Sequence, residues 1–567
     1  MIKSQMQVSQ TEVVAENGVV AGGHPLEAEA GVRVMQEGGN AIDALVASAF
    51  VGFVVEPESC GIGGYGRLSI YLAETKTFVT IDHYVRAPLQ SRPDMFELDT
   101  ETPWHYYGHP KTKGLQAERG YLSPAVPGAV AGLHEAHSRF GKLPWEQVLA
   151  PAIEIAKAGV PVSWRLSLTI GTMIDQLNQF PQLAHFLLQN GRAPNFKNAW
   201  ANGHKLDTTD LANTLQLIAE KGPAGFYEGA IAAAIEKKIK AGGGILTAAD
   251  LAAYQPKILH EKPCRYRNSH YISAYDQVAY EVLNILDRFD LKQYGPNSLE
   301  FRHLVAEALG HGFIDNKVHY GDPDYVQSPV AGLTSRAFAN SRNIRLDQAA
   351  PRPIQPADPW PYETEVLKPD IISNSPTLGR NSGTSQMVTA DKAGNFCALI
   401  TSISSAFGSL VMVPGTGIIL NNSMQNFDPR PEHPNGIQPG KMPIFAAPSL
   451  VATQDGQAIF AGAGSGGYRI MTGVLHAFLH HIDFDMPIQD AIDAPRVHCQ
   501  GQETAVDSRI PVEIQQKLAE MGHQVEVTFE TPGSNYYGRI AGIHRDLKTG
   551  LLHAGSGPAW TTSTAGF

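Results

Sequence analysis

The sequence has little of what metal, nucleic-acid and disulfide-rich proteins depend on. Its 567 residues include only four cysteines, Cys60, Cys264, Cys397 and Cys499, which are too far apart for a C-x-x-C or zinc-type spacing. Scattered thiols of this kind favour a reducing, cytoplasmic location. The formal net charge is −11 and no run of basic residues occurs, which argues against a nucleic-acid partner.

Long hydrophobic runs are also missing. The longest, residues 44–55, is too short to span a bilayer and ends in Glu56-Pro57, so we expect a buried helix there. The first 18 residues are polar and lack a positively charged start followed by an apolar core. No secretory signal is predicted from them, and we expect no membrane association.

Two patterns could suggest a cofactor, but neither is complete. Residues 61–66 read GIGGYG, yet this G-x-G-x-x-G match follows an apolar helix rather than a strand. Several histidines and aspartates also gather in one short stretch: His476, His480, His481, Asp483 and Asp485. Their spacing gives no complete set of metal ligands. The sequence therefore predicts neither a metal nor an organic cofactor.

The length allows two or three layers of structure. Helices are expected at 25–36 and 41–54, because Pro25 suits a first helical turn and Asn40 can cap the second helix. From about 347 to 383 the chain is rich in proline, asparagine and serine and has little periodicity. We interpret this segment as a long mobile loop.

The most informative stretch is NSGTSQMVTADKAGNFCALITSISSAFGS, residues 381–409. It predicts a β-hairpin with strands at 384–390 and 396–404, and Gly383 allows a tight bend before it. If the Gly383–Thr384 bond is cut, the new α-amino group of Thr384 can act as base for its own hydroxyl. That pairing is typical of N-terminal-nucleophile hydrolases.

The same stretch resembles the processing-site signature of the γ-glutamyltransferases (glutathione hydrolases). The shared features are Thr384-Ser385, the D-K-x-G-N turn at 391–395, Ser402 and Phe407-Gly408. Other blocks extend the resemblance from Gly22 to about Ser556, among them HPLEAEAGVRVMQEGGNAIDALVASAFVGFVVEPESCGIGG near the start and APRVH near the end. The resemblance implies an α+β fold, the four-layer αββα sandwich of N-terminal-nucleophile hydrolases.

The resemblance also implies how the chain is divided and which residues react. We expect cleavage between Gly383 and Thr384, giving a large subunit, 1–383, and a small subunit, 384–567. Thr384 would attack an amide carbonyl, and Gly466 and Gly467 match the paired glycines of the family's oxyanion hole. Ser402 stands where the family has a threonine that hydrogen-bonds the nucleophile.

The positions with which the family recognises glutamate are changed. Tyr84 occupies the place of an arginine that binds the glutamate carboxylate, and a tyrosine is not equivalent to a guanidinium. Arg86, two residues further on, or Arg67 could bind a small carboxylate instead. Five more substrate-contact positions differ from the family residues: Ser404, Ser423, Asn426, Phe445 and Ala446.

Retained attack machinery with altered contacts favours an amidohydrolase for another acyl group. Oxamate amidohydrolases and cephalosporin (glutaryl) acylases are relatives of this sort, so we expect a small carboxylate-bearing acyl group. One alternative is a γ-glutamyltransferase with altered glutamate contacts. Another is an unprocessed, non-catalytic scaffold, against which the intact Thr384, Gly466 and Gly467 argue. The expected partners are a small-molecule substrate and the two subunits of one precursor.

Overall fold

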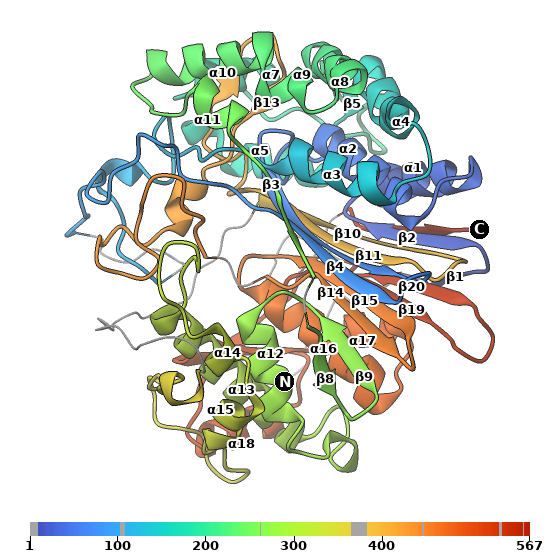
Figure 1. Ribbon diagram of the computed structural model, residues 1–567, viewed down its shortest axis with the longest axis vertical. Helices are drawn as coiled ribbons and strands as arrows, with labels where there is room; N and C mark the ends of the chain where they lie inside the picture. The colour runs from blue at the N-terminus through green and yellow to red at the C-terminus, as the bar shows by residue number, and fades with distance from the viewer. Residues whose placement is uncertain are drawn as a thin grey trace.

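The computed structural model describes residues 10–101, 108–260, 262–363, 383–444, 447–531, 536–558 and 561–567. Two seven-stranded sheets lie face to face between two layers of helices (Figure 1). The helices labelled from α1 to α11 lie on the outer side of the sheet that contains β10 and β11, and those from α12 to α18 lie on the outer side of the sheet that contains β14, β15 and β19 (Figure 1). The four-layer αββα fold predicted from the sequence is confirmed.

The first sheet has the strand order β21-β2-β10-β11-β3-β4-β7. In that order the strands are Ser563–Gly566, Gly18–Gly22, Gly383–Asp391, Phe396–Ser404, Tyr65–Leu72, Thr77–His83 and Lys257–Leu259. The predicted hairpin forms its centre as β10 and β11, with β10 one residue longer at each end than expected. Both strands are buried along their whole length, so the hairpin is part of the core.

The second sheet has the order β1-β20-β19-β15-β14-β9-β8. In that order its strands are Val13–Ala15, Leu552–Ser556, Arg539–Arg545, Gln457–Ser465, Leu450–Gln454, His270–Ser273 and Cys264–Tyr266. Apolar side chains from the facing strands of both sheets share one buried cluster, among them Val388, Ala398, Phe460 and Ile540. Alternate residues of β10, starting at Thr384, therefore face the space between the sheets.

The helices of the first layer are α1 Pro25–Gln36, α2 Ala41–Val55, α3 Ala129–Phe140, α4 Trp145–Ala158, α5 Trp164–Thr172, α6 Ile174–Leu177, α7 Pro181–Leu187, α8 Thr209–Lys221, α9 Ala224–Tyr227, α10 Gly229–Ala241 and α11 Ala248–Ala252. Those of the second are α12 Gln277–Leu286, α13 Leu299–His319, α14 Val330–Leu333, α15 Arg336–Ser341, α16 Arg469–Phe484, α17 Ile488–Asp493 and α18 Val512–Glu520. Smaller sheets pair β5 Val160–Pro161 with β6 Lys205–Leu206, β12 Met412–Val413 with β13 Ile418–Ile419, and β16 Val497–Cys499 with β17 Glu503–Asp507 and β18 Gln524–Thr528.

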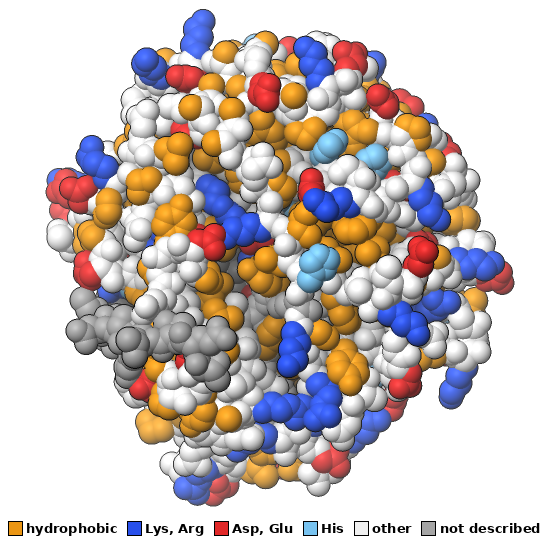
Figure 2. Space-filling model, viewed as in Figure 1, with side chains coloured by type: hydrophobic (Ala, Val, Ile, Leu, Met, Phe, Trp, Pro, Cys, Tyr) orange, Lys and Arg blue, Asp and Glu red, His pale blue; other side chains and the backbone are white. Residues whose placement is uncertain are grey.

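Helix α2 is the buried helix that its apolar sequence predicts. All of its residues are buried, and the Asn40 side chain caps it by accepting hydrogen bonds from the backbone of Ile42 and Asp43. Across the described part of the chain, no helix combines the length and apolar character needed to cross a membrane. The face in Figure 2 carries acidic and basic side chains interspersed with apolar ones.

The segment predicted to be a mobile loop is described only in its first part, residues 347–363. That part is attached to the body, since the Ala349 N–H donates to the Met521 carbonyl at 2.8 Å and the Ile354 N–H to the Gly501 carbonyl at 2.6 Å. Residues 364–382 lie outside the described residues. The mobility of that stretch and the subunit boundary after Gly383 stay predictions.

Candidate active site

Thr384 is the first residue of β10 whose side chain faces the space between the two sheets. It is almost fully buried, with 2% of its surface exposed. Its hydroxyl lies 3.0 Å from the Ser402 hydroxyl, on the directly paired residue of β11. Ser402 donates to the Gly383 carbonyl oxygen at 2.6 Å and accepts from the Ser404 N–H at 2.8 Å. Because a hydroxyl has one proton, Thr384 is the donor to Ser402. The predicted nucleophile and the predicted scissile carbonyl thus contact the same side chain.

Position 383 must be a glycine because the surrounding backbone leaves no room for a side chain. A Cβ at this position would lie 2.3 Å from the Ser405 carbonyl oxygen, far inside contact distance. The chain after β11 turns sharply here: Ser404 has a φ of +80° and Phe407 of +57°. Positive φ is uncommon for residues other than glycine and concentrates at functional sites. A constrained backbone therefore surrounds the Gly383–Thr384 bond.

Gly466 and Gly467 join β15 to α16 and have φ values of +136° and +62°. Their carbonyls accept from the N–H groups of Arg469 and Ile470 at 3.3 and 3.1 Å, the first bonds of α16. Successive backbone N–H groups at such a turn and helix start bind anions. The preceding residue, Ser465, accepts a hydrogen bond from a side chain that also contacts Thr384, so the glycine pair lies beside the nucleophile.

That shared side chain is Arg539 on β19, which the sequence analysis missed. Its Nε donates to the Ser465 hydroxyl at 2.8 Å and its Nη2 to the Thr384 carbonyl oxygen at 2.9 Å. Glu56 lies 3.5 Å from Arg539 Nη1 and accepts a hydrogen bond from the Ser385 hydroxyl. Two signals were present: a charged residue that ends an apolar helix and an arginine that opens the apolar strand RIAGI.

The environment gives these buried charges different protonation states. Burial alone would raise the pKa of Glu56, but the guanidiniums of Arg539 and Arg165 hold this pKa at about 2. Burial and the charge of Glu56 raise the pKa of Glu27 well above its usual range, which favours the protonated form of Glu27. Burial lowers the pKa of Arg539 to about 9, so this guanidinium is charged at neutral pH.

Three of the predicted substrate-contact residues form one uncharged network. Asn426 donates to the Tyr84 hydroxyl at 2.9 Å, and the Ser404 hydroxyl donates to Asn426 Oδ1 at 3.2 Å. Gln425 donates to the Ser404 hydroxyl at 3.0 Å. Burial raises the pKa of Tyr84 well above its usual range, so the phenol stays neutral. The structure brings Tyr84, Ser404 and Asn426 together beside Ser402.

The remaining predicted substrate contacts, Ser423, Phe445 and Ala446, do not belong to this hydrogen-bond network among the described residues. Ser423 begins the 3-10 helix η4, Ser423–Asn426, and its buried hydroxyl has no hydrogen-bond partner among the described residues. Phe445 and Ala446 lie outside the described residues. The next residue, Ala447, donates from its backbone to Asp276, the residue that caps α12.

The two candidate carboxylate-binding arginines differ in how their charge is balanced. Arg67 on β3 donates to the Tyr275 carbonyl at 3.1 Å and lies 4.0 Å from the Asp82 carboxylate. Arg86 donates to the Val85 carbonyl at 3.2 Å, and its buried Nη2 has no hydrogen-bond partner in the described part of the chain. Within the same residues no carboxylate lies within ion-pair distance of Arg86. Of the two candidates, Arg86 is therefore the one whose charge is not balanced by a carboxylate of the described residues.

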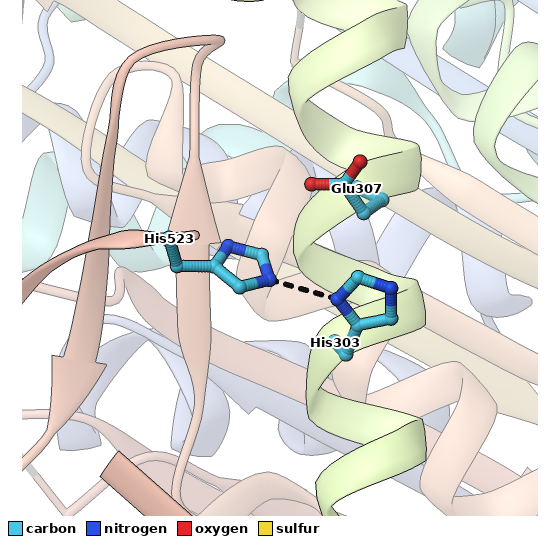
Figure 3. Close-up of side chains that lie close together, drawn as sticks. All are labelled: His303, Glu307 and His523. Atoms are coloured by element: carbon cyan, nitrogen blue, oxygen red, sulfur yellow. Dashed lines mark hydrogen bonds between the residues drawn. The ribbon is translucent and has the colours of Figure 1, made fainter. Parts of the chain in front are cut away.

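One group of side chains has a metal-like arrangement that the sequence did not suggest. His303 and Glu307 on α13 and His523 have potential ligand atoms within 4.8 Å of one another (Figure 3). His303 Nδ1 lies 2.8 Å from His523 Nε2, and Arg352 contacts both Glu307 and His523. Because a guanidinium already neutralises the carboxylate, we interpret the group as a hydrogen-bonded link between α13 and the C-terminal region.

Residues 28–567 match the family model described as gamma-glutamyltranspeptidase. The chain belongs to this family. It is 35% identical over 514 residues to "Acylase ACY 1 proenzyme" of Pseudomonas sp. (strain SE83), covering 90% of this chain and 87% of that protein. It is 32% identical over 530 residues to "Glutathione hydrolase proenzyme" of Bacillus subtilis (strain 168), covering 92% and 87%.

A solved structure supports the same assignment. The cephalosporin acylase of Bacillus halodurans superposes with a TM-score of 0.85 at 29% identity, covering 100% of this chain and 98% of that one. The protein is thus an enzyme of the acylase and gamma-glutamyltranspeptidase group, an N-terminal-nucleophile hydrolase or transferase. The non-catalytic alternative does not fit these relatives.

Proposed function

We propose that the protein is a self-processing N-terminal-threonine amidohydrolase that cleaves the amide of a small carboxylate-bearing acyl group through an acyl-enzyme. One observation carries the proposal: the Thr384 hydroxyl and the Gly383 carbonyl oxygen both hydrogen-bond Ser402, at 3.0 and 2.6 Å. Two of its relatives are named proenzymes. This geometry suits attack of the hydroxyl on the preceding carbonyl.

Processing would begin when Thr384 Oγ1 bonds to the Gly383 carbonyl carbon. The Thr384 proton passes to Ser402, whose own proton moves to the developing oxyanion, so the hydroxyl chain stays balanced. The C–N bond then breaks, the amine takes a proton, and an ester joins Gly383 to the threonine oxygen. Water hydrolyses the ester, which leaves a carboxylate on Gly383 and a free amine and hydroxyl on Thr384.

In turnover the same hydroxyl attacks the substrate amide. The Thr384 amine takes the hydroxyl proton and returns it to the departing amine of the substrate. The N–H groups of Gly466 and Gly467 stabilise the tetrahedral oxyanion, an effect of about 3 kcal/mol per donor in related sites. Water then releases the acyl group and regenerates the nucleophile.

The proposed acyl group follows from the charges around the site. The network of Tyr84, Ser404 and Asn426 offers no carboxylate to the ammonium of a free glutamate, whereas Arg86 has charge for one carboxylate. Gln386 lies two residues after Thr384 on the same face of β10, about 7 Å along the strand. Its buried amide has no hydrogen-bond partner among the described residues, so it can bind a polar acyl chain.

A direct experiment separates this substrate class from the γ-glutamyl alternative. Purified enzyme is assayed on three matched anilides, which carry an oxalyl, a glutaryl or a γ-glutamyl group. We expect a higher kcat/KM for the oxalyl or glutaryl anilide, which lacks the α-ammonium, than for the γ-glutamyl anilide. In Arg86→Met the KM for the preferred anilide should rise. Preference for the γ-glutamyl anilide would favour the alternative, and an effect confined to Arg67→Met would assign the carboxylate to Arg67. A cytoplasmic location remains part of the proposal, supported by four cysteines without disulfides.

A further inference from the structure

Arg539 is a charged side chain that contacts the backbone of the nucleophile. Its Nη2 lies 2.9 Å from the Thr384 carbonyl oxygen, and its other end is fixed by Ser465. The backbone nitrogen and oxygen of one residue in a strand are about 3 Å apart. The guanidinium therefore lies within about 6 Å of the atom that becomes the Thr384 amine. Both residues are buried, so water screens the interaction poorly.

An unperturbed α-amino group has a pKa of about 7.7–8.0 and is mostly protonated at neutral pH. A protonated amine cannot take the hydroxyl proton, so an N-terminal threonine needs an environment that disfavours the ammonium form. A like charge within about 6 Å does this, and such neighbours shift pKa values by about 1–3 units.

We propose that Arg539 keeps the Thr384 amine unprotonated at neutral pH and so makes it a base, while Glu56 limits the effect from the opposite face of β10. This inference rests on the proposed function, because the amine exists only after cleavage. Arg539 acts on the amine through its charge and is a positioning residue. Glu56 reaches the strand through Ser385, whose side chain points away from the Thr384 hydroxyl, and it holds Arg539 in place.

The ionisable groups around this point come from several elements: His24 and Glu27 of the α1 region, Glu56 and Glu58 after α2, Arg165 on α5 and Arg539 on β19. Arg165 lies within ion-pair distance of both Glu56 and Glu58, and Arg539 lies within that distance of Glu56. Burial raises the pKa of Glu58 and lowers that of His24. Burial also raises the pKa of the nearby Cys60 thiol, which stays uncharged. Of the two guanidiniums, Arg539 donates directly to the Thr384 carbonyl oxygen.

The test compares Arg539→Gln with Glu56→Gln, two changes to a neutral amide that remove charges of opposite sign. In processed enzyme, the acidic limb of kcat/KM against pH reports the amine. Arg539→Gln should move this limb up by about 1 pH unit or more, and Glu56→Gln should move it down. Arg539→Lys should restore the wild-type limb. A role that is only structural would lower activity in both variants without shifts of opposite sign.

A second preparation keeps the test decisive if a variant does not process itself. Residues 1–383 are co-expressed with a ubiquitin fusion of 384–567, which a deubiquitylase trims to leave Thr384 first, and wild type made the same way is the control. The pH dependence of Thr384 amine labelling, followed by mass spectrometry, gives the amine pKa without turnover. Unchanged labelling curves in both variants would overturn the inference. Wild-type protein that neither cleaves nor hydrolyses any acyl amide would instead overturn the proposed function.

Discussion

The attack site and the recognition network lie side by side but are built differently. Thr384, Ser402 and Arg539 are on β10, β11 and β19, in the centres of the two sheets. Tyr84 and Asn426 lie after a strand and in a short 3-10 helix, and their contacts are neutral hydrogen bonds. Buried ions surround the first region, whereas the second is uncharged.

This difference indicates which part of the molecule can change its chemistry. Strand residues in the core are fixed by pairing on both sides, so one change there disturbs many contacts. Residues in connecting segments can be replaced while the scaffold stays the same. Thr384 lies on a core strand, whereas Tyr84 and Asn426 lie in connecting segments, and the variants below test this division.

The largest effect is expected from Thr384→Ala, which removes the nucleophile. The protein should stay a single chain on a denaturing gel and lose at least about 10⁴-fold in acyl-amide hydrolysis. Thr384→Ser keeps the hydroxyl and should still be cleaved at residue 383, as intact mass will report. Cleavage at the same bond in the alanine variant would remove the basis of the comparison.

Ser402→Ala should have the next largest effect, because it removes the hydrogen bonds to both Thr384 and the Gly383 carbonyl. We expect slower processing and a fall in kcat of about 10²–10³-fold with little change in KM. Ser402→Thr retains the hydroxyl and should recover most of the rate. A change confined to KM would move Ser402 from the attack site to the recognition network.

A paired change in the recognition network should be milder for attack but should alter selectivity. Tyr84→Arg with Asn426→Asp introduces two opposite charges, which can pair with each other when no substrate is bound. The ratio of kcat/KM for a γ-glutamyl anilide over a glutaryl anilide should rise about 10-fold or more, since hydrogen bonds to charged groups contribute about 1.5–3 kcal/mol. Processing should be unchanged, and impaired processing would mean that the two regions are coupled.

The smallest effect on turnover is expected at Asp276, which caps α12 next to Ala447. Burial raises the pKa of Asp276 to about 7, against 3.8 for the unfolded chain. The folded protein therefore binds this proton more tightly, so the contribution of Asp276 to stability is complete below about pH 4 and is lost as pH rises towards 7, at about 1.4 kcal/mol per pH unit. Asp276→Asn should flatten this part of the melting-temperature profile, and an unchanged slope would contradict the assignment.

Much of the fold could be predicted because its signals are local. Helices α1 and α2 have their caps next to them in the sequence, and the hairpin is marked by two strands around a turn. The histidine stretch 476–485 lies mostly in α16, where His476 and His480 pack against Phe301. The metal-like group at His303 was missed because its members are far apart in the chain.

By itself the sequence determined the family pattern, because the threonine after Gly383 and the pair Gly466-Gly467 each stand in short runs of consecutive residues. The tertiary structure decided which distant side chains act on them. Arg539 lies beside Thr384 only because β19 and β10 belong to facing sheets, and Glu56 joins them only where α2 ends above β10. Charges interact through space in a poorly screened interior, and sequence spacing does not contain that distance.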